Sequence, residues 1–266
     1  MLGTKVRLSR EASQGGTLAI PTGTLRKIQG HGGLQKPAAG VGRWAVGQKR
    51  RYPQPTAHSP QPTIHSPQPP CHTGSMGGKR FTVAITGASG SAFGVAVLRR
   101  LAANADVAAI ALLLSPTGKR CLADETGQTV KELCALSPKI THHDERNLGA
   151  AISSGSYRQD GMALVPCSAG ALGRIASGIS ESLVSRAADV CLKERSPLVL
   201  CLRETPLNRI HLENMLRVHD AGAIVMPIMP GFYAKPSGLD DLFDTFATRV
   251  LDQLGLPEDD PRRWKG

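Results

Sequence analysis

The sequence predicts an α/β domain, a three-layer doubly wound fold with a mainly parallel sheet. Short apolar runs recur along the chain, and each has the length of a strand that is buried on both faces. Stretches with helical apolar spacing lie between these runs, and small-residue loops follow several of them. Strands that alternate with helices pair in parallel and carry helices on both faces of the sheet.

The predicted domain spans residues 76–266, and a basic leader rich in Pro and Gly precedes it at residues 1–75. Ten Lys or Arg and one acidic residue give the leader a charge of +9, whereas 22 basic and 20 acidic residues leave the rest at +2. The charge of the whole chain therefore does not indicate a nucleic-acid partner for the domain. The leader repeats PQPTAHS, PQPTIHS and PQPP without a helix or strand period, so we expect it to be disordered.

The expected location is the cytoplasm. No apolar run approaches the roughly 18 residues that cross a bilayer. The six cysteines form no CxxC pair, which is typical of a reduced protein without a zinc site or disulfide framework. The leader has no apolar core with a cleavage site, so we expect no secretory signal. An organellar transit segment and a translation start at Met76 both fit the composition, and we favour the second.

The first predicted strand, at 81–86, leads into the loop GASGSAFG and then into a helix. Gly87, Gly90 and Gly94 do not follow the GxGxxG spacing. Two interpretations stay open. The backbone N–H groups at the helix start can cradle a phosphate or a flavin, or the glycines form a tight turn that packing alone requires.

Two further strands end in small-residue loops. Val107–Leu114 ends at Ser115, and the strand at 162–166 ends before Cys167 and Ser168. Both loops are expected at the sheet edge that holds Ser89. Glu125 follows a short predicted helix and is solvated on pattern alone. Residues 126–160 show little organisation, and residues 182–194 are predicted to form an amphipathic helix.

The central strand, Leu198–Leu202, runs directly into Arg203 and Glu204. Open α/β sheets place their ligands at the carboxyl ends of such strands. Thr205 and Pro206 have the residue types of an N-cap and a first helical position, so a helix is predicted to begin there and point its positive end toward the pair. That arrangement can hold an anion or a developing charge. The alternative is a surface ion pair on a loop.

A last strand and a last helix complete the predicted domain. The strand at 223–228 ends in MPGFYAKP, where two prolines and a glycine fix a loop around Tyr233. The helix presents one apolar face, which consists of Leu239, Leu242, Phe243, Phe246, Val250, Leu251 and Leu254. Arg249 lies at the border of that face, where a solvated side chain is the default.

Four predicted loops thus gather Ser89, Ser115, Ser168, Arg203 and Glu204 at one sheet edge. Small side chains and hydroxyls let a planar cofactor approach the backbone, and arginine neutralises phosphate. The pattern favours an FMN site, although other nucleotides fit it as well.

The motifs TGASGSAFG, PCSAG, SRAADVCLKERSPLVLCLRETPLNRIHLENM and GAIVMPIMPGFY, with Ser115 and a terminal RRW, resemble those of the flavin prenyltransferases. The resemblance covers residues 80–264. It implies a Rossmann-like domain that assembles through trimers, commonly into dodecamers, with active sites at subunit contacts. It implies transfer of a dimethylallyl group from a monophosphate to N5 and C6 of reduced FMN. The product would serve a partner decarboxylase of the ubiquinone pathway or of the aromatic-acid type.

The resemblance also implies roles for individual residues. FMN would be bound by Gly87, Ala88, Ser89, Ser115, Ser168, Ala169, Gly170, Ala171 and Arg203. The substrate phosphate would be held by Lys193, Arg203, Tyr233 and Arg249, some of them from a neighbouring subunit. Protons and the allylic cation would be managed by Ser89, Glu125 and Glu204. No metal is expected, because the chain has no Asp-rich DDxxD run and a basic cluster can bind a monophosphate by itself.

Two other functions fit the sequence less well. An FMN-dependent cysteine decarboxylase would have a histidine base near the first helix, where this chain reads SGSAFGVAV. A non-catalytic FMN carrier would not need the second phosphate site of Lys193, Arg203, Tyr233 and Arg249.

Overall fold

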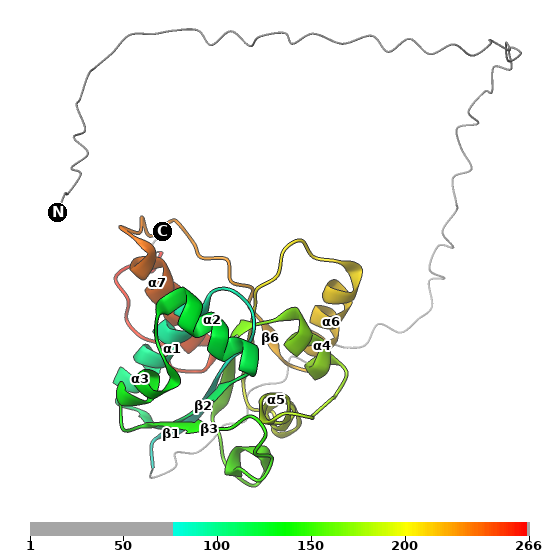
Figure 1. The fold of residues 1–266 in the computed structure, drawn as a ribbon. Coiled ribbons are helices and arrows are strands. Elements are labelled where there is room, and N and C mark those ends of the chain that lie inside the picture. The colour runs from blue at the N-terminus through cyan, green and yellow to red at the C-terminus, as the bar shows by residue number, and fades with distance from the viewer. Residues whose placement is uncertain (1–76, 265–266) are drawn as a thin grey trace, which may run out of the picture. The chain divides into compact units, whose positions relative to one another are not determined.

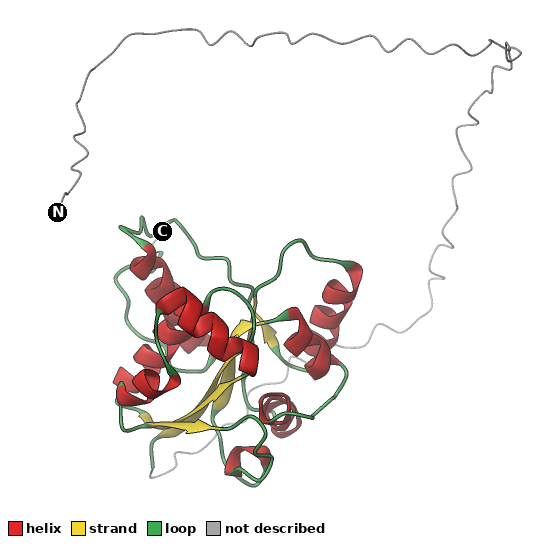
Figure 2. Cartoon of the chain, viewed as in Figure 1, coloured by secondary structure: helices red, strands yellow, loops and turns green. Residues whose placement is uncertain are grey.

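The computed structural model describes residues 77–264, so the predicted disordered leader lies outside the described residues. Within them, six strands form one sheet in the order β3-β2-β1-β4-β5-β6, and all neighbouring strands are parallel (Figures 1 and 2). The strands are β1 Lys79–Ile85, β2 Val107–Leu114, β3 Ile140–His143, β4 Gly161–Cys167, β5 Leu198–Leu202 and β6 Ile224–Val225. The predicted α/β fold with a parallel sheet is confirmed.

Helices cover both faces of the sheet. In the described residues they are α1 Ser91–Ala103, α2 Pro116–Thr126, α3 Val130–Ala135, α4 Ala169–Ala176, α5 Leu183–Glu194, α6 Arg209–Asp220 and α7 Leu239–Gln253, with a 3-10 turn at Ala151–Ser153. One core cluster joins the sheet to α1, α2, α3 and α7, and a second joins it to α4, α5 and α6 (Figure 1). The predicted three layers follow from these two cores.

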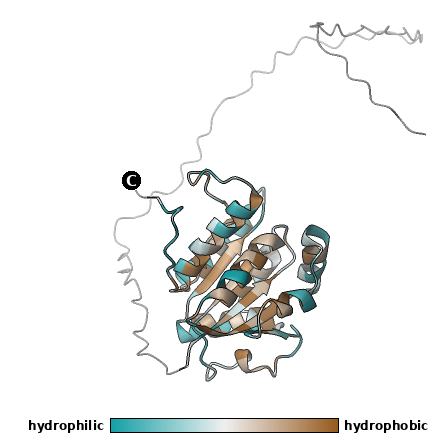
Figure 3. Cartoon of the chain, turned by 90° about the vertical axis from the view of Figure 1, so that its left-hand side faces the viewer, coloured by the Kyte–Doolittle hydropathy of each residue, from teal (hydrophilic) through white to brown (hydrophobic). Residues whose placement is uncertain are grey.

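Side-chain alternation along the strands builds both cores at once. In β1, Val83 and Ile85 lie in the first cluster, whereas Ala84 between them lies in the second. The strand β5 is fully buried along its whole length. This two-sided burial explains why the strands read as continuous apolar runs, and Figure 3 shows the apolar residues concentrated in the sheet.

Two predictions about element boundaries are wrong. No helix begins at Thr205 and Pro206; α6 starts at Arg209, with Asn208 as its N-cap. The Asn208 side chain accepts a hydrogen bond from the His211 N–H at 2.9 Å, which satisfies the helix start three residues later than predicted. The strand predicted at 223–228 is regular only at Ile224–Val225, although the Met226 and Ile228 N–H groups still donate to the Leu200 and Leu202 carbonyl oxygens of β5 at 2.9 Å.

Residues 126–160, which the sequence left unassigned, contain α3, β3 and the 3-10 turn. The six-residue helix α3 is too short to show a periodic pattern, and a capping box between Thr129 and Glu132 holds its start. The edge strand β3 has one buried side chain among four, so it lacks an apolar run.

The predicted apolar face of α7 is confirmed from Leu242 onward: it is partly buried at first and fully buried in the second half of the helix. Phe246, Val250 and Leu251 are buried against the first core, whereas Leu239 is 68% exposed. Phe93 of α1 packs edge-to-face against Phe243 and Phe246, with ring centroids 4.8 and 5.1 Å apart. Within residues 77–264, no helix is long and apolar enough to cross a membrane.

Candidate active site

The carboxyl ends of four strands meet at one edge of the sheet. Ile85 pairs with Leu114 at the ends of β1 and β2, and Cys167 pairs with Leu202 at the ends of β4 and β5. The loops with Ser89, Ser115, Ser168, Arg203 and Glu204 begin there, as predicted.

Thr86 joins two of these loops, and no pattern in the sequence indicated this role. Its buried hydroxyl donates to the Pro166 carbonyl oxygen at 2.8 Å and accepts the Ser168 N–H at 2.8 Å. The Arg203 N–H donates to the Cys167 carbonyl oxygen at 3.0 Å and joins the next loop. Three of the four loops are therefore linked to one another by backbone and hydroxyl hydrogen bonds.

Glu125 is not simply solvated, as its local pattern suggested. Its carboxylate accepts the Gly90 N–H at 2.9 Å and the Ser91 N–H at 2.7 Å, at the first turn of α1. Burial raises the pKa of this carboxyl, but hydrogen bonds from the Ser91 N–H, the Ser89 hydroxyl and the Gly90 N–H outweigh burial and lower the pKa overall. The carboxylate thus takes the place where an external phosphate would meet α1, and it is charged at neutral pH.

The glycines of GASGSAFG have reasons within the chain itself. A Cβ on Gly87 would collide with the Thr117 side chain, and one on Gly94 would collide with the Val165 carbonyl oxygen. Gly90 has φ +107°, a conformation that favours glycine. Packing therefore accounts for Gly87 and Gly94 and backbone conformation for Gly90, and neither reason excludes a ligand at this loop.

Ser115 and Ser168 each cap a helix at this edge. The Ser115 Oγ accepts the Gly118 N–H at 3.0 Å, and the Ser168 Oγ accepts the Ala171 N–H at 3.2 Å. Gly170 in the first turn of α4 is exposed, and a Cβ there would meet only the Arg174 Nη1 at 3.9 Å. The surface beside α4 is therefore open to a ligand that approaches the backbone.

Arg203 and Glu204 are both exposed, and they are not paired with each other. The Glu204 carboxylate accepts the Thr205 N–H at 3.0 Å, and no carboxylate of residues 77–264 forms an ion pair with Arg203. The alternative of a surface ion pair is not what the structure shows. The Arg203 guanidinium remains available to an anion.

Of the other proposed phosphate ligands, Lys193 does not join this group within one chain. The helix α5 starts near the carboxyl edge and returns, so Lys193 near its end lies at the opposite edge, beside Gly155 and in an ion pair with Glu194. Arg249 lies on the outer side of α7 and pairs with Asp252 at 2.9 Å. Tyr233, 49% exposed, packs against Trp264 with ring centroids 6.2 Å apart.

Among the described residues, this edge has neither a reactive thiol at Cys167 nor a cluster of metal ligands. Burial raises the pKa of Cys167 to about 12, so its thiol is not a nucleophile at neutral pH. Within residues 77–264, no three His, Cys, Asp or Glu side chains gather where they could hold a metal ion.

Comparison with known proteins decides the family. A family model described as Flavoprotein matches residues 71–251. The flavin prenyltransferase UbiX of Deinococcus radiodurans is 47% identical over 189 residues, which cover 71% of this chain and 95% of the relative. The chain belongs to the flavin prenyltransferase family.

Two solved structures of similar proteins have the same fold. A dodecameric FMN-dependent UbiX-like decarboxylase from Escherichia coli O157:H7 is 42% identical with a TM-score of 0.67, over 70% of this chain and 100% of that one. AnUbiX in complex with FMN and dimethylallyl pyrophosphate is also 42% identical, with a TM-score of 0.63, over 71% of this chain and 98% of that one. The Rossmann-like fold expected for a flavin prenyltransferase is therefore confirmed.

Proposed function

We propose that this chain is a flavin prenyltransferase that transfers a dimethylallyl group from dimethylallyl monophosphate to N5 and C6 of reduced FMN. The observation that carries the proposal is the relative solved with FMN and dimethylallyl pyrophosphate, which this chain matches over 98% of that protein's length. The choice of a monophosphate over a diphosphate donor is part of the proposal, and the absence of an Asp-rich run in the sequence supports it.

FMN suits the residues at the carboxyl edge. The loops there carry small side chains, the exposed Gly170 leaves the α4 backbone open, and Arg203 is free of carboxylate partners among residues 77–264. We assign FMN to Gly87, Ala88, Ser89, Ser115, Ser168, Ala169, Gly170, Ala171 and Arg203. When bound in its reduced form, FMN supplies the nucleophilic N5 and C6 atoms.

The two carboxylates at this edge suit different tasks. Glu125 is fixed by the N–H groups of Gly90 and Ser91 and has a lowered pKa, so it can stabilise a developing positive charge but does not donate a proton at neutral pH. Glu204 accepts a hydrogen bond from the Thr205 N–H, so its remaining lone pairs can bind other donors, and we propose that it handles the proton of the reaction. The Ser89 hydroxyl donates a hydrogen bond to the Glu125 carboxylate, and we assign Ser89 to the catalytic residues together with Glu125 and Glu204.

One chain does not bring to this edge all the cations that we assign to the donor phosphate. Arg203 is present, but Lys193 lies at the opposite edge of the same sheet. We therefore propose that Lys193 enters the site of a neighbouring subunit, with Tyr233 and Arg249 completing the phosphate site across the contact. A homo-oligomer, in the form of a trimer-based dodecamer, meets this requirement, and the dodecameric relative supports it.

The remaining proposals concern the setting of the protein. The prenylated FMN is proposed to serve a partner decarboxylase of the ubiquinone-pathway or aromatic-acid type. The protein is proposed to be cytoplasmic, with residues 76–266 as the flavoprotein domain.

The test is anaerobic incubation of the full chain with reduced FMN and dimethylallyl monophosphate, followed by mass analysis of the flavin. The expected product is a flavin that is heavier by one dimethylallyl unit, with release of inorganic phosphate. An unaltered flavin mass would contradict prenyl transfer. It would favour the alternative functions, an FMN carrier or an FMN-dependent cysteine decarboxylase.

A further inference from the structure

The C-terminal segment 256–264, here called the C-terminal strap, runs back along α7. It begins with buried Leu256; Asp260 and Arg262 then contact positions nearer the start of that helix, whereas Arg263 reaches back to Asp252 near its end. Asp260 meets Thr248 at 3.0 Å, and Arg262 meets Asp244 at 2.9 Å. Trp264 ends against Tyr233, which precedes α7 in the chain. The strap thus leads from the amino edge of the sheet to the loop that carries Tyr233.

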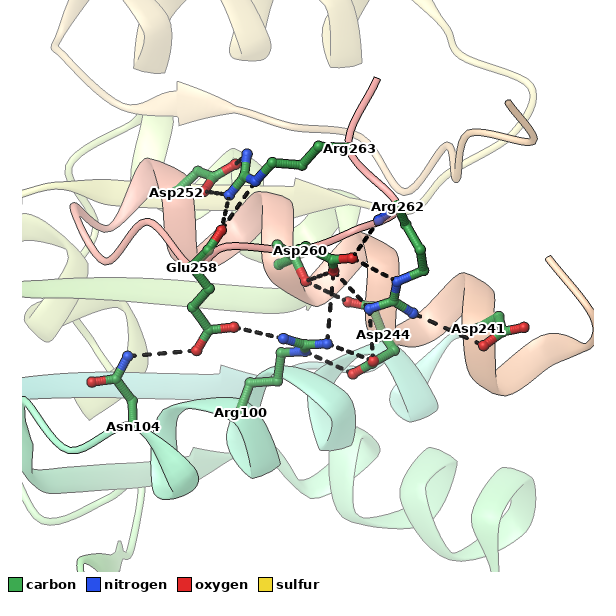
Figure 4. Close-up of polar contacts among 10 residues, drawn as sticks. Arg100, Asn104, Asp241, Asp244, Asp252, Glu258, Asp260, Arg262 and Arg263 are labelled. Atoms are coloured by element: carbon green, nitrogen blue, oxygen red, sulfur yellow. Dashed lines mark hydrogen bonds and ion pairs between the residues drawn. The ribbon is translucent and has the colours of Figure 1, made fainter. Parts of the chain in front are cut away.

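Asp260 is the central anchor of the strap (Figure 4). It is 4% exposed, and its carboxylate accepts the Arg262 N–H at 2.9 Å, the Arg262 Nη2 at 2.7 Å and the Thr248 hydroxyl at 3.0 Å. Arg100 of α1 lies 3.8 Å from the same carboxylate. A buried carboxylate with this many donors holds its neighbours in one arrangement.

Ion pairs hold the strap to α1 and α7 on both sides of Asp260. Arg100 pairs with Asp244 at 2.5 Å and with Glu258 at 2.6 Å. Arg263 pairs with Asp252 at 2.5 Å, as the close-up shows (Figure 4). Several partly buried charges that share partners form a network, which fixes geometry better than one exposed pair does.

The strap contacts one of the four residues that we assign to the donor phosphate, and it shares a carboxylate partner with a second. Trp264 lies edge-to-face against Tyr233, at a centroid distance of 6.2 Å and an angle of 89°. Asp252, which holds Arg263 of the strap, also accepts the Arg249 Nη1 at 2.9 Å. One anchored segment therefore bears on both Tyr233 and Arg249, which are 16 residues apart in the sequence.

We propose that the C-terminal strap positions Tyr233 and Arg249 for the donor phosphate, and that Asp260 is the positioning residue that holds the strap. The inference rests on the proposed function. Asp260 does not touch the substrate; it acts through Arg262, the strap and Trp264. Loss of this anchor weakens the use of the donor and leaves FMN binding as it is, because the carboxyl-edge loops make no contact with the strap's anchor.

The variant Asp260→Asn tests the proposal in the full chain, with Glu213→Gln as the control. Glu213 forms an exposed ion pair with Arg209 on α6, away from α7, so the control also removes one carboxylate charge. We expect Asp260→Asn to raise the KM for dimethylallyl monophosphate roughly 10- to 100-fold, since small displacements of positioning groups have effects of that order. The Kd for FMN stays unchanged, and the control behaves as the parent does.

Fluorescence reports the strap directly. Trp44 and Trp264 are the two tryptophans of the sequence, so a Trp44→Phe background isolates Trp264. We expect Asp260→Asn to increase quenching of Trp264 by acrylamide and shift its emission. If Trp264 is released while the donor KM stays within about twofold of the parent, which is below the effect expected of a positioning group, the proposal is overturned.

Arg263→Gln is the second variant, in case Asp260→Asn does not fold. It removes the pair with Asp252 and leaves the Asp260 contacts with Thr248 and Arg262 intact. A raised donor KM with unchanged FMN binding supports the proposal, and an unchanged KM contradicts it. The proposed function is tested separately by the parent, since a parent that leaves the flavin unaltered fails before any variant is compared.

Discussion

The proposal that each site draws on two chains predicts that two inactive variants restore each other. Lys193→Ala and Glu204→Gln should each suppress the prenylated product while FMN stays bound, because neither side chain belongs to the FMN set. Glu204 lies just beyond the carboxyl end of β5, whereas Lys193 lies near the end of α5, at the opposite sheet edge. Co-assembled oligomers of the two variants then contain sites in which both residues are intact.

The size of the effect follows from counting chains. If equal amounts of the two variants mix at random, a site takes an intact Glu204 about half the time and an intact Lys193 from another chain about half the time. About one quarter of wild-type activity should therefore return. The assay is co-expression with two affinity tags, sequential purification of mixed oligomers, and anaerobic measurement of prenylated FMN per subunit.

A second mixture serves as the control. Wild type mixed with a chain that carries both substitutions should keep about one quarter of full activity if two chains build each site, and about one half if one chain does. No recovery in the first mixture together with one half in the second would refute the two-chain site.

Three further predictions concern stability and the site. Gly94→Ala should destabilise the chain by about 1–3 kcal/mol through its clash with the Val165 carbonyl, whereas Gly173→Ala, which meets its nearest atom at 3.6 Å, should be neutral or stabilising, as urea unfolding would show. Asp260 has a lowered pKa, mainly through its hydrogen bond with Arg262, so its contribution to the free energy of unfolding is fully present above the unfolded pKa of about 4 and is lost progressively as pH falls from there towards the lower folded pKa. Asp260→Asn should therefore flatten the acid limb of Tm against pH in thermal melts from pH 7 to 3. Glu125→Gln should lower the free energy of unfolding by about 1 kcal/mol, because it weakens the cap on α1. The variant should also lower the rate of prenyl transfer while FMN affinity is unchanged; if the rate and the FMN affinity fall together, Glu125 has a structural role only.

The central strands could be predicted from the sequence because each is buried on both faces. The runs at 107–114 and 198–202 match β2 and β5 residue for residue. Parallel pairing then places Ser115, Ser168 and Arg203 at one edge without any knowledge of side-chain contacts. The apolar pattern therefore predicts the fold and also the position of these three site residues.

The features that the sequence did not predict depend mainly on contacts between residues that are distant in the chain. Glu125 looked solvated because its partners, Gly90 and Ser91, lie 35 and 34 residues away. The edge strand β3 has too little buried surface to leave a pattern. The strap could not be predicted, because Asp260 contacts Thr248 only once the chain has reversed its direction beyond α7 and also binds Arg262. The family resemblance supplied Glu125 as a site residue where local pattern could not.

The most direct test of the account is a crystal structure of the full chain with FMN and dimethylallyl monophosphate. The account predicts the flavin ring at the carboxyl edge, beside Ser89, Gly170 and Arg203. It also predicts the donor phosphate within hydrogen-bond distance of Arg203 of one subunit and Lys193 of its neighbour. A flavin bound elsewhere, or a donor phosphate that no Lys193 of any subunit approaches, would contradict it.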